Sequence, residues 1–262
     1  MKQGQSIATE EKARGLDSIF QQQLSVYRRM SQAAYAPYVH IDLHAGSGFN
    51  DEVGVIGSPV LFCERANSIH PNYLMLCVEQ NRQRVQELGK RLKNNPKAFP
   101  QYGDNAEFCR CVPEILFQHG VEPGQAVGSL LIDPNSFRGQ IPWRELNDLL
   151  RTCGRLDAIF NYPGTAYTRN KRKLPDDFVS IEDLPKMLIK KHWLIREPIG
   201  PFKFTLCVGR NTDKLKIPKN LGKRPFVQWD SQSGKRFRLM ANHSKKELEM
   251  IPCTGQLEFS FG

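Results

Sequence analysis

Short apolar runs alternate with amphipathic segments between residues 38 and 162. The run Leu130-Leu131-Ile132 is apolar without a break, which is typical of a strand buried on both faces of a parallel sheet. Strands that alternate with helices in this way predict a Rossmann-like, doubly wound α/β fold with a mostly parallel sheet. The predicted strands are residues 39–45, 73–79, 99–103, 128–133 and 156–162, and the predicted helices are residues 58–66, 80–92, 106–118 and 143–152.

The pattern differs on either side of this region. Residues 9–36 have helical periodicity, and residues 165–177 are polar and basic. Residues 181–192 are predicted to be helical, and residues 193–196 and 203–208 to form a closing hairpin, which gives a sheet of about seven strands. Further on, residues 226–229 and 236–240 are predicted to be the two strands of a hairpin around a turn at residues 231–234. The expected organisation is an N-terminal helical segment (1–37), a Rossmann-like α/β domain (38–212) and a basic C-terminal extension (213–262).

The composition is that of a soluble globular protein, with 40% hydrophobic and 24% charged residues among 262. The formal net charge of +10 favours polyanionic partners, nucleic acid first. The alternative is a basic but solvated surface. Charge by itself does not decide between the two.

Neither the cysteines nor the termini suggest export, a metal site or a membrane. The seven cysteines include no Cys-x-x-Cys pair, so we expect most of them to be buried, reduced thiols and we expect no metal site. The first residues are polar and no apolar run reaches about 18 residues. We therefore expect a cytoplasmic protein without a membrane segment.

A glycine-rich turn follows the first predicted strand. Glycines in the segment Asp42–Gly48 let the backbone approach a ligand closely, and ligands of open α/β sheets bind at this edge. An acidic residue at the end of the second strand could accept the hydroxyls of an adenosine ribose. The same pattern also suits a dinucleotide, but the third glycine of that fingerprint is missing. The predicted cofactor-binding residues are Asp42, His44, Gly46, Gly48, Glu79, Asp104 and Asn105.

The fourth predicted strand ends in Asp133 and Pro134, which resembles the Asp-Pro-Pro-Tyr motif of amino-group methyltransferases. An acceptor oxygen there can hydrogen-bond an amine, while an aromatic ring stacks on the base and orients it. Phe137 supplies that ring one place later than the motif, and Asp133, Pro134 and Phe137 are the predicted catalytic residues. The alternative is that Asp133 only caps a loop. The predicted substrate-binding residues are Asn135, Tyr162, Arg169, Lys171 and Arg172.

Three segments together resemble the three-Cys-motif partner (TcmP) family. They are residues 38–48, the Gly57-Ser58-Pro59 triplet, and Asp133-Pro134 followed by Ile141-Pro142-Trp143. The sequence departs from the family at Ser47, where proline is expected, and at Asn135, where an aromatic residue is expected. The resemblance implies a Rossmann-like fold related to methyltransferases, with a poorly defined target.

The sequence therefore predicts an S-adenosylmethionine-dependent methyltransferase that acts on nucleic acid, with the exocyclic amine of adenine in DNA as the first candidate. Two other classes stay open. One is a noncatalytic nucleic-acid-binding module or partner subunit with a Rossmann shell. The other is a methyltransferase of RNA or of small molecules.

Overall fold

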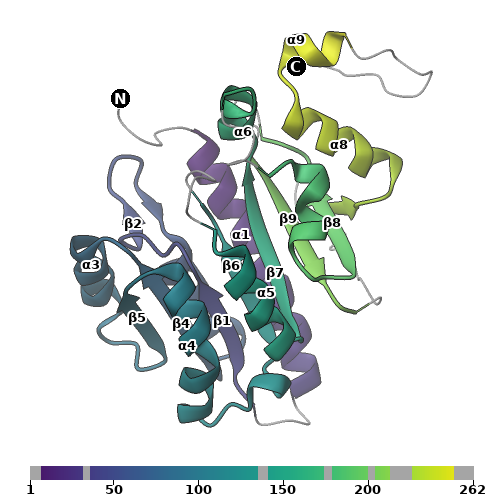
Figure 1. Cartoon of the computed structure of the whole chain (residues 1–262). Helices are drawn as coiled ribbons and strands as arrows, with labels where there is room; N and C mark the ends of the chain where they lie inside the picture. Colours follow the sequence, from purple (N-terminus) through teal and green to yellow (C-terminus); the bar gives the residue numbers. More distant parts are fainter. Residues whose placement is uncertain are drawn as a thin grey trace.

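The computed structural model describes residues 7–31, 36–134, 141–173, 179–199, 204–212 and 226–250. In this part of the chain, one large sheet has the strand order β10-β8-β9-β7-β6-β1-β4-β5, and β2 and β3 form a separate hairpin (Figure 1). The strands are β1 (Tyr38–Asp42), β2 (Phe49–Asn50), β3 (Val55–Ile56), β4 (Tyr73–Glu79), β5 (Ala98–Tyr102), β6 (Gly128–Ile132), β7 (Leu156–Pro163), β8 (His192–Arg196), β9 (Phe204–Arg210) and β10 (Phe226–Gln228).

Five strands of the large sheet, β5, β4, β1, β6 and β7, run parallel. On the other side of β7, the strands β9, β8 and β10 each pair antiparallel with their neighbour. The mostly parallel, Rossmann-like α/β fold with a closing β8–β9 hairpin is thus confirmed. The predicted number of strands was wrong, because β10 pairs with β8 and makes the sheet eight-stranded.

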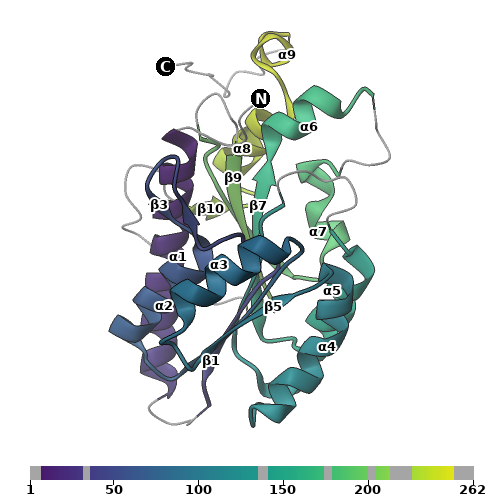
Figure 2. The same cartoon turned by 90° about the vertical axis from the view of Figure 1, so that its left-hand side faces the viewer.

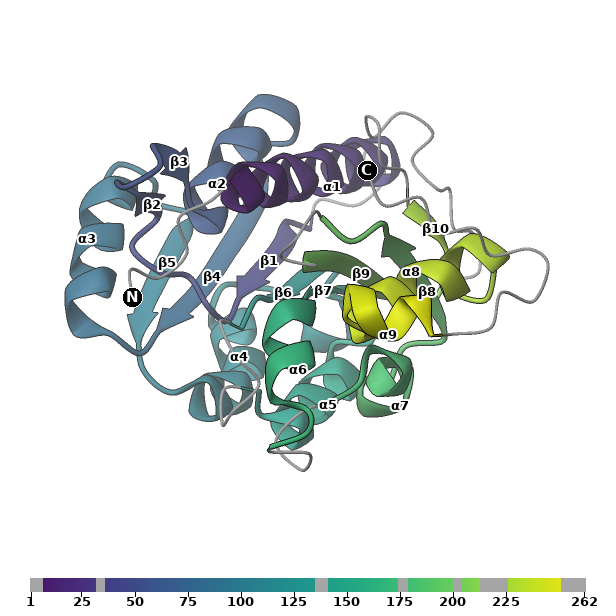
Figure 3. The same ribbon diagram turned by 90° about the horizontal axis from the view of Figure 1, so that it is seen from above.

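Helices cover both faces of the sheet (Figures 2 and 3). They are α1 (Ile7–Ser31), α2 (Ser58–Ile69), α3 (Arg82–Leu92), α4 (Asn105–Gln118), α5 (Trp143–Thr152), α6 (Gly164–Asn170), α7 (Leu184–Met187), α8 (Gln232–Asn242) and α9 (Lys245–Glu249). Figure 2 shows α1 and α2 on one side of the sheet, and α4 and α5 on the other. No helix in the described ranges combines the length and the apolar character needed to cross a membrane.

Successive residues of the central strands feed two separate cores. Leu130 and Ile132 of β6 pack in the core beneath α4 and α5. Leu131, between them, packs in the core beneath α1, α2 and α3. Because neighbouring strand residues point to opposite faces, a strand covered on both sides needs apolar residues on both faces. This explains the unbroken apolar run in β6.

Two predicted elements were wrong. Residues 236–240 belong to helix α8 and not to a strand, because Ser231 caps the helix by accepting the Gly234 N–H at 3.0 Å. The helical spacing of Arg238 and Ala241 buries both. The predicted helix 181–192 is also shorter. A 3₁₀ turn and α7 end at Met187, and His192 already begins β8.

Candidate functional site

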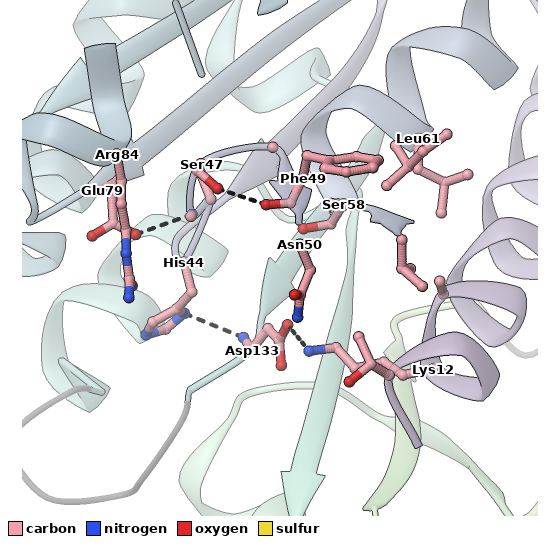
Figure 4. A pocket seen from close by; sticks show the side chains of 18 of the residues that line it. Lys12, His44, Ser47, Phe49, Asn50, Ser58, Leu61, Glu79, Arg84 and Asp133 are labelled. Atoms are coloured by element: carbon pink, nitrogen blue, oxygen red, sulfur yellow. Dashed lines mark hydrogen bonds and ion pairs between the residues drawn. The ribbon is translucent and has the colours of Figure 1, made fainter. Parts of the chain in front are cut away.

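A cavity of about 950 Å³ opens at the carboxyl edge of the sheet, beyond β1, β4 and β6 (Figure 4). The glycine-rich turn, the β2–β3 hairpin, the starts of α2 and α3 and the first turns of α1 provide its walls. This is the edge at which the sequence predicts a cofactor. The lining includes five of the predicted cofactor-binding residues and also the predicted catalytic residue Asp133. The five are His44, Gly46, Gly48, Glu79 and Asn105.

Asp42 ties the glycine-rich turn to the start of α2. It is fully buried and is not among the residues that line the cavity. One oxygen accepts the His44 N–H at 2.9 Å, and the other accepts the Ser58 hydroxyl at 2.6 Å. Burial raises the pKa of Asp42 to about 6. Asp42 therefore holds the glycine-rich turn in place without lining the cavity itself.

The Gly57-Ser58-Pro59 triplet packs on the glycine-rich turn. The Gly57 N–H donates to the Gly48 carbonyl at 2.9 Å. A Cβ on Gly57 would lie 2.8 Å from the Gly48 carbonyl carbon, so no side chain fits there. Pro59 lies in the first turn of α2, and Ser58 is not the cap of this helix. Gly57 is the cap residue, and the Ser58 hydroxyl donates to Asp42 instead.

Glu79 closes the other side of the turn. Its two oxygens accept the Gly46 N–H at 3.0 Å and the Asn81 N–H at 2.8 Å. Asn105 also lines the cavity, whereas Asp104 is exposed and absent from the lining. Asp104 caps α4 by accepting two backbone N–H groups, at 2.8 and 3.2 Å. The structure thus gives Asp104 a capping role beside the site.

Asp133 is held from three directions at the end of β6. The Asn161 amide donates to one carboxylate oxygen at 2.7 Å, and Lys12 forms an ion pair with the other. The Asp133 N–H donates to His44 Nδ1 at 3.2 Å. Burial opposes ionisation, but Lys12 and Asn161 outweigh it and hold the pKa of Asp133 below its ordinary value. Figure 4 shows His44 and Lys12 reaching Asp133 from opposite sides.

His44 connects two strand ends. While Nδ1 accepts the Asp133 N–H, Nε2 lies 3.1 Å from the Asn105 amide. A ring nitrogen that accepts an N–H carries no proton. The His44 ring therefore fixes the backbone of Asp133 through Nδ1.

Lys12 is a residue of the site that the sequence by itself does not mark. It lies in a polar stretch of α1, 121 positions before its partner, and no local pattern marks it. Only the packing of α1 over the sheet brings its side chain into the cavity.

The remaining predicted site residues lie elsewhere. Pro134 is buried next to Asp133, and Asn135 and Phe137 fall outside the described residues. Tyr162 is fully buried in the core and its hydroxyl donates to Asn242 at 3.0 Å. It does not line the cavity.

The three predicted basic residues follow β7 at the same edge of the sheet. Arg169 is exposed on α6. Lys171 and Arg172 both pair with Glu247 of α9, at 3.4 and 3.1 Å. Two of the three cations are thus partly neutralised by the C-terminal part of the chain.

The cavity lining is acidic although the protein is basic. Four acidic side chains line it against two basic ones, whereas the whole chain has a net charge of +10. The acidic residues are Asp51, Glu52, Glu79 and Asp133, and the basic ones are Lys12 and Arg84. Such a lining favours a ligand that carries positive charge.

Comparisons with known proteins show the fold and not a family. No protein-family model matches the chain, and no curated protein matches its sequence. Protein LPL1258 from Legionella pneumophila matches in structure with a TM-score of 0.52 and 13% identity, over 76% of this chain and 85% of the other. This likeness shows a shared fold.

The solved structures that match also include several methyltransferases. A methyltransferase from Geobacter sulfurreducens has a TM-score of 0.40 and 14% identity, over 73% of this chain and 78% of the other. The fibrillarin pre-rRNA processing protein of Methanococcus jannaschii has a TM-score of 0.44 and 15% identity, over 66% of each chain. The resemblance to the TcmP family stays a prediction.

Proposed function

We propose that this chain binds S-adenosylmethionine in the cavity and transfers its methyl group to an amine. The acidic lining beside the glycine-rich turn carries this proposal. S-adenosylmethionine has a sulfonium and an ammonium group against one carboxylate, so its net charge is positive and complements the lining. A dinucleotide brings an anionic pyrophosphate, which such a lining disfavours.

The residues of the cavity fit this ligand. Each oxygen of Glu79 accepts one backbone N–H and keeps a second lone pair, so the carboxylate can also accept ribose hydroxyls. Gly46 and Gly48, with φ of 62° and 79°, let the turn approach the ligand. We place the adenine beside Asn105, which also lines the cavity. When bound, S-adenosylmethionine supplies an activated methyl group.

Asp133 is the proposed acceptor for the hydrogens of the target amine. Its low pKa keeps the carboxylate ionised at neutral pH, and Asn161 fixes its orientation. Hydrogen bonds from an amine to this carboxylate favour a pyramidal nitrogen with an available lone pair. The target must come to the end of β6, and a base in duplex DNA would have to be flipped out.

We further propose that the target is nucleic acid, with the exocyclic amine of adenine in DNA as the first candidate. The Asp133-Pro134 corner and the exposed Arg169 at the same sheet edge support it. Phosphate contacts from basic side chains would position the strand without reading its sequence.

The test is to incubate the protein with methyl-labelled S-adenosylmethionine and, separately, DNA, RNA and protein, and to identify the modified groups. Label as methyladenine in DNA supports the whole proposal, and label in RNA retains the chemistry with another substrate. Asp133→Ala should abolish transfer, while Asp148→Ala, an exposed aspartate on α5, should not. Full transfer by Asp133→Ala would refute the role of Asp133. No label and no binding would favour a noncatalytic module.

A further inference from the structure

Lys12 occupies the position where the target amine is proposed to meet Asp133. Its ammonium group pairs with one oxygen of Asp133, while the Asn161 amide takes the other at 2.7 Å. The Lys12 side chain is 26% exposed and that of Asp133 is 11% exposed. A target amine that approaches that oxygen of Asp133 therefore meets the Lys12 ammonium group and competes with it for the carboxylate.

The backbone of Lys12 is fixed by the packing of α1. Three residues further on, Gly15 meets the sheet so closely that a Cβ there would lie 2.7 Å from Leu206. Leu16 is buried in the core, and Asp17 accepts a hydrogen bond of 2.8 Å from Arg65 of α2. Any release of Asp133 must therefore come from rotation of the long Lys12 side chain and not from movement of the helix.

The two cations of the lining lie on opposite sides of the cavity. Figure 4 shows Arg84 beside Glu79 on one side and Lys12 on the other. In the proposed function, Glu79 takes the ribose. An adenosyl amino acid carries a single carboxylate, at the end of the molecule opposite to its adenosine. With the ribose at Glu79, this carboxylate lies on the side of the cavity where Lys12 is.

We propose that Lys12 exchanges partners: it pairs with Asp133 and transfers to the α-carboxylate of the adenosyl amino acid when that ligand binds. The exchange neutralises the incoming carboxylate and frees one oxygen of Asp133 for the target amine. Binding of the methyl donor thereby prepares the acceptor position, and the donor binds before the target. This inference rests on the proposed function, because it assumes a donor with an α-amino acid end.

The test compares two ligands by calorimetry. S-adenosylhomocysteine carries the α-carboxylate, whereas methylthioadenosine shares the adenosine but lacks the amino acid end. Lys12→Met should weaken binding of S-adenosylhomocysteine by up to about ten- to a hundredfold. That is the size of one lost charge-assisted hydrogen bond, and the Lys12–Asp133 pair that the wild type breaks on binding reduces it. Binding of methylthioadenosine should not change, which also shows that the variant is folded. Lys90→Met, an exposed lysine of α3 outside the cavity, should change neither.

A second variant should change the affinity for S-adenosylhomocysteine in the opposite direction. Asp133→Asn removes the carboxylate that competes for Lys12, so S-adenosylhomocysteine should bind more tightly. When Asp133→Asn is combined with Lys12→Met, this gain in affinity should disappear, because Asp133 affects ligand binding only through its pairing with Lys12.

Each result decides between distinct failures. The exchange is overturned if Lys12→Met weakens the binding of both ligands equally, or of neither. In that case the proposed function still stands, provided that the wild-type protein binds the ligands. A gain from Asp133→Asn that persists without Lys12 would also overturn it. If the wild-type protein binds neither ligand, the proposed function itself fails.

Discussion

Asp42 should make the protein less stable as the pH rises. Its side chain is fully buried, and burial raises its pKa from 3.8 to about 6. The folded protein thus favours the protonated carboxyl, so this contribution to stability is fully present below about pH 4 and is lost as the pH rises through about 6. At about 1.4 kcal/mol per pKa unit, the loss amounts to about 3 kcal/mol.

The assay is urea unfolding followed by tryptophan fluorescence, at about pH 4 and about pH 8. Asp42→Asn cannot titrate, so the free energy of unfolding of the wild type should fall relative to this variant by about 3 kcal/mol between the two pH values. Asp51→Asn, an exposed carboxylate in the hairpin loop, is the matched control and should change stability by less than about 0.5 kcal/mol. A wild-type–variant difference that is the same at both pH values would refute the reasoning.

Three further substitutions test the loops around the cavity. Ser58→Ala removes the 2.6 Å hydrogen bond to Asp42 and should cost about 1.5–3 kcal/mol at pH 8, measured by urea unfolding. A loss below about 0.5 kcal/mol, the size of a surface change, would show that the bond contributes little. Gly57→Ala sets a methyl group 2.8 Å from the Gly48 carbonyl carbon and should lower both stability and affinity for S-adenosylhomocysteine. Unchanged affinity would mean that the turn does not touch the ligand. Glu79→Gln leaves one backbone N–H of the turn facing an amide and should weaken the affinity for S-adenosylhomocysteine by about tenfold or more. If this variant binds methylthioadenosine as tightly as the wild type does, Glu79 does not contact the ribose.

The sequence predicted those parts of the fold that depend on local pattern. The apolar run that contains Leu130–Ile132 predicts a strand covered by helices on both faces. Glu79 ends another parallel strand, so it is expected at the same carboxyl edge of the sheet. The positions of the glycine-rich turn and Asp133 at that edge follow from this order of strands.

Other parts depended on contacts that no local pattern encodes. Residues 236–240 contain Phe237 and Leu239, two apolar side chains with the spacing of a strand, yet the Ser231 cap and the burial of Ala241 on the sheet select a helix. Ser58 is of a residue type that often caps a helix, but it is the first residue of α2 and its hydroxyl donates to the buried Asp42 carboxylate.

The electrostatics of the cavity were equally hidden from the sequence. The pairing of Lys12 with Asp133 joins the N-terminal helix to the fourth parallel strand. The acidic lining likewise arises from segments scattered between residues 9 and 133 of a basic chain. Charge counted along the sequence points to polyanions, whereas charge counted around the cavity points to a cationic ligand.

Calorimetric titration of the wild-type protein with S-adenosylmethionine and, separately, with NAD and NADP tests the nature of the cavity most directly. We predict one binding event per chain for S-adenosylmethionine, lost or strongly weakened in Glu79→Ala, and no binding of either dinucleotide. Binding of a dinucleotide without binding of S-adenosylmethionine would contradict both the assignment of the ligand and the argument from the acidic lining.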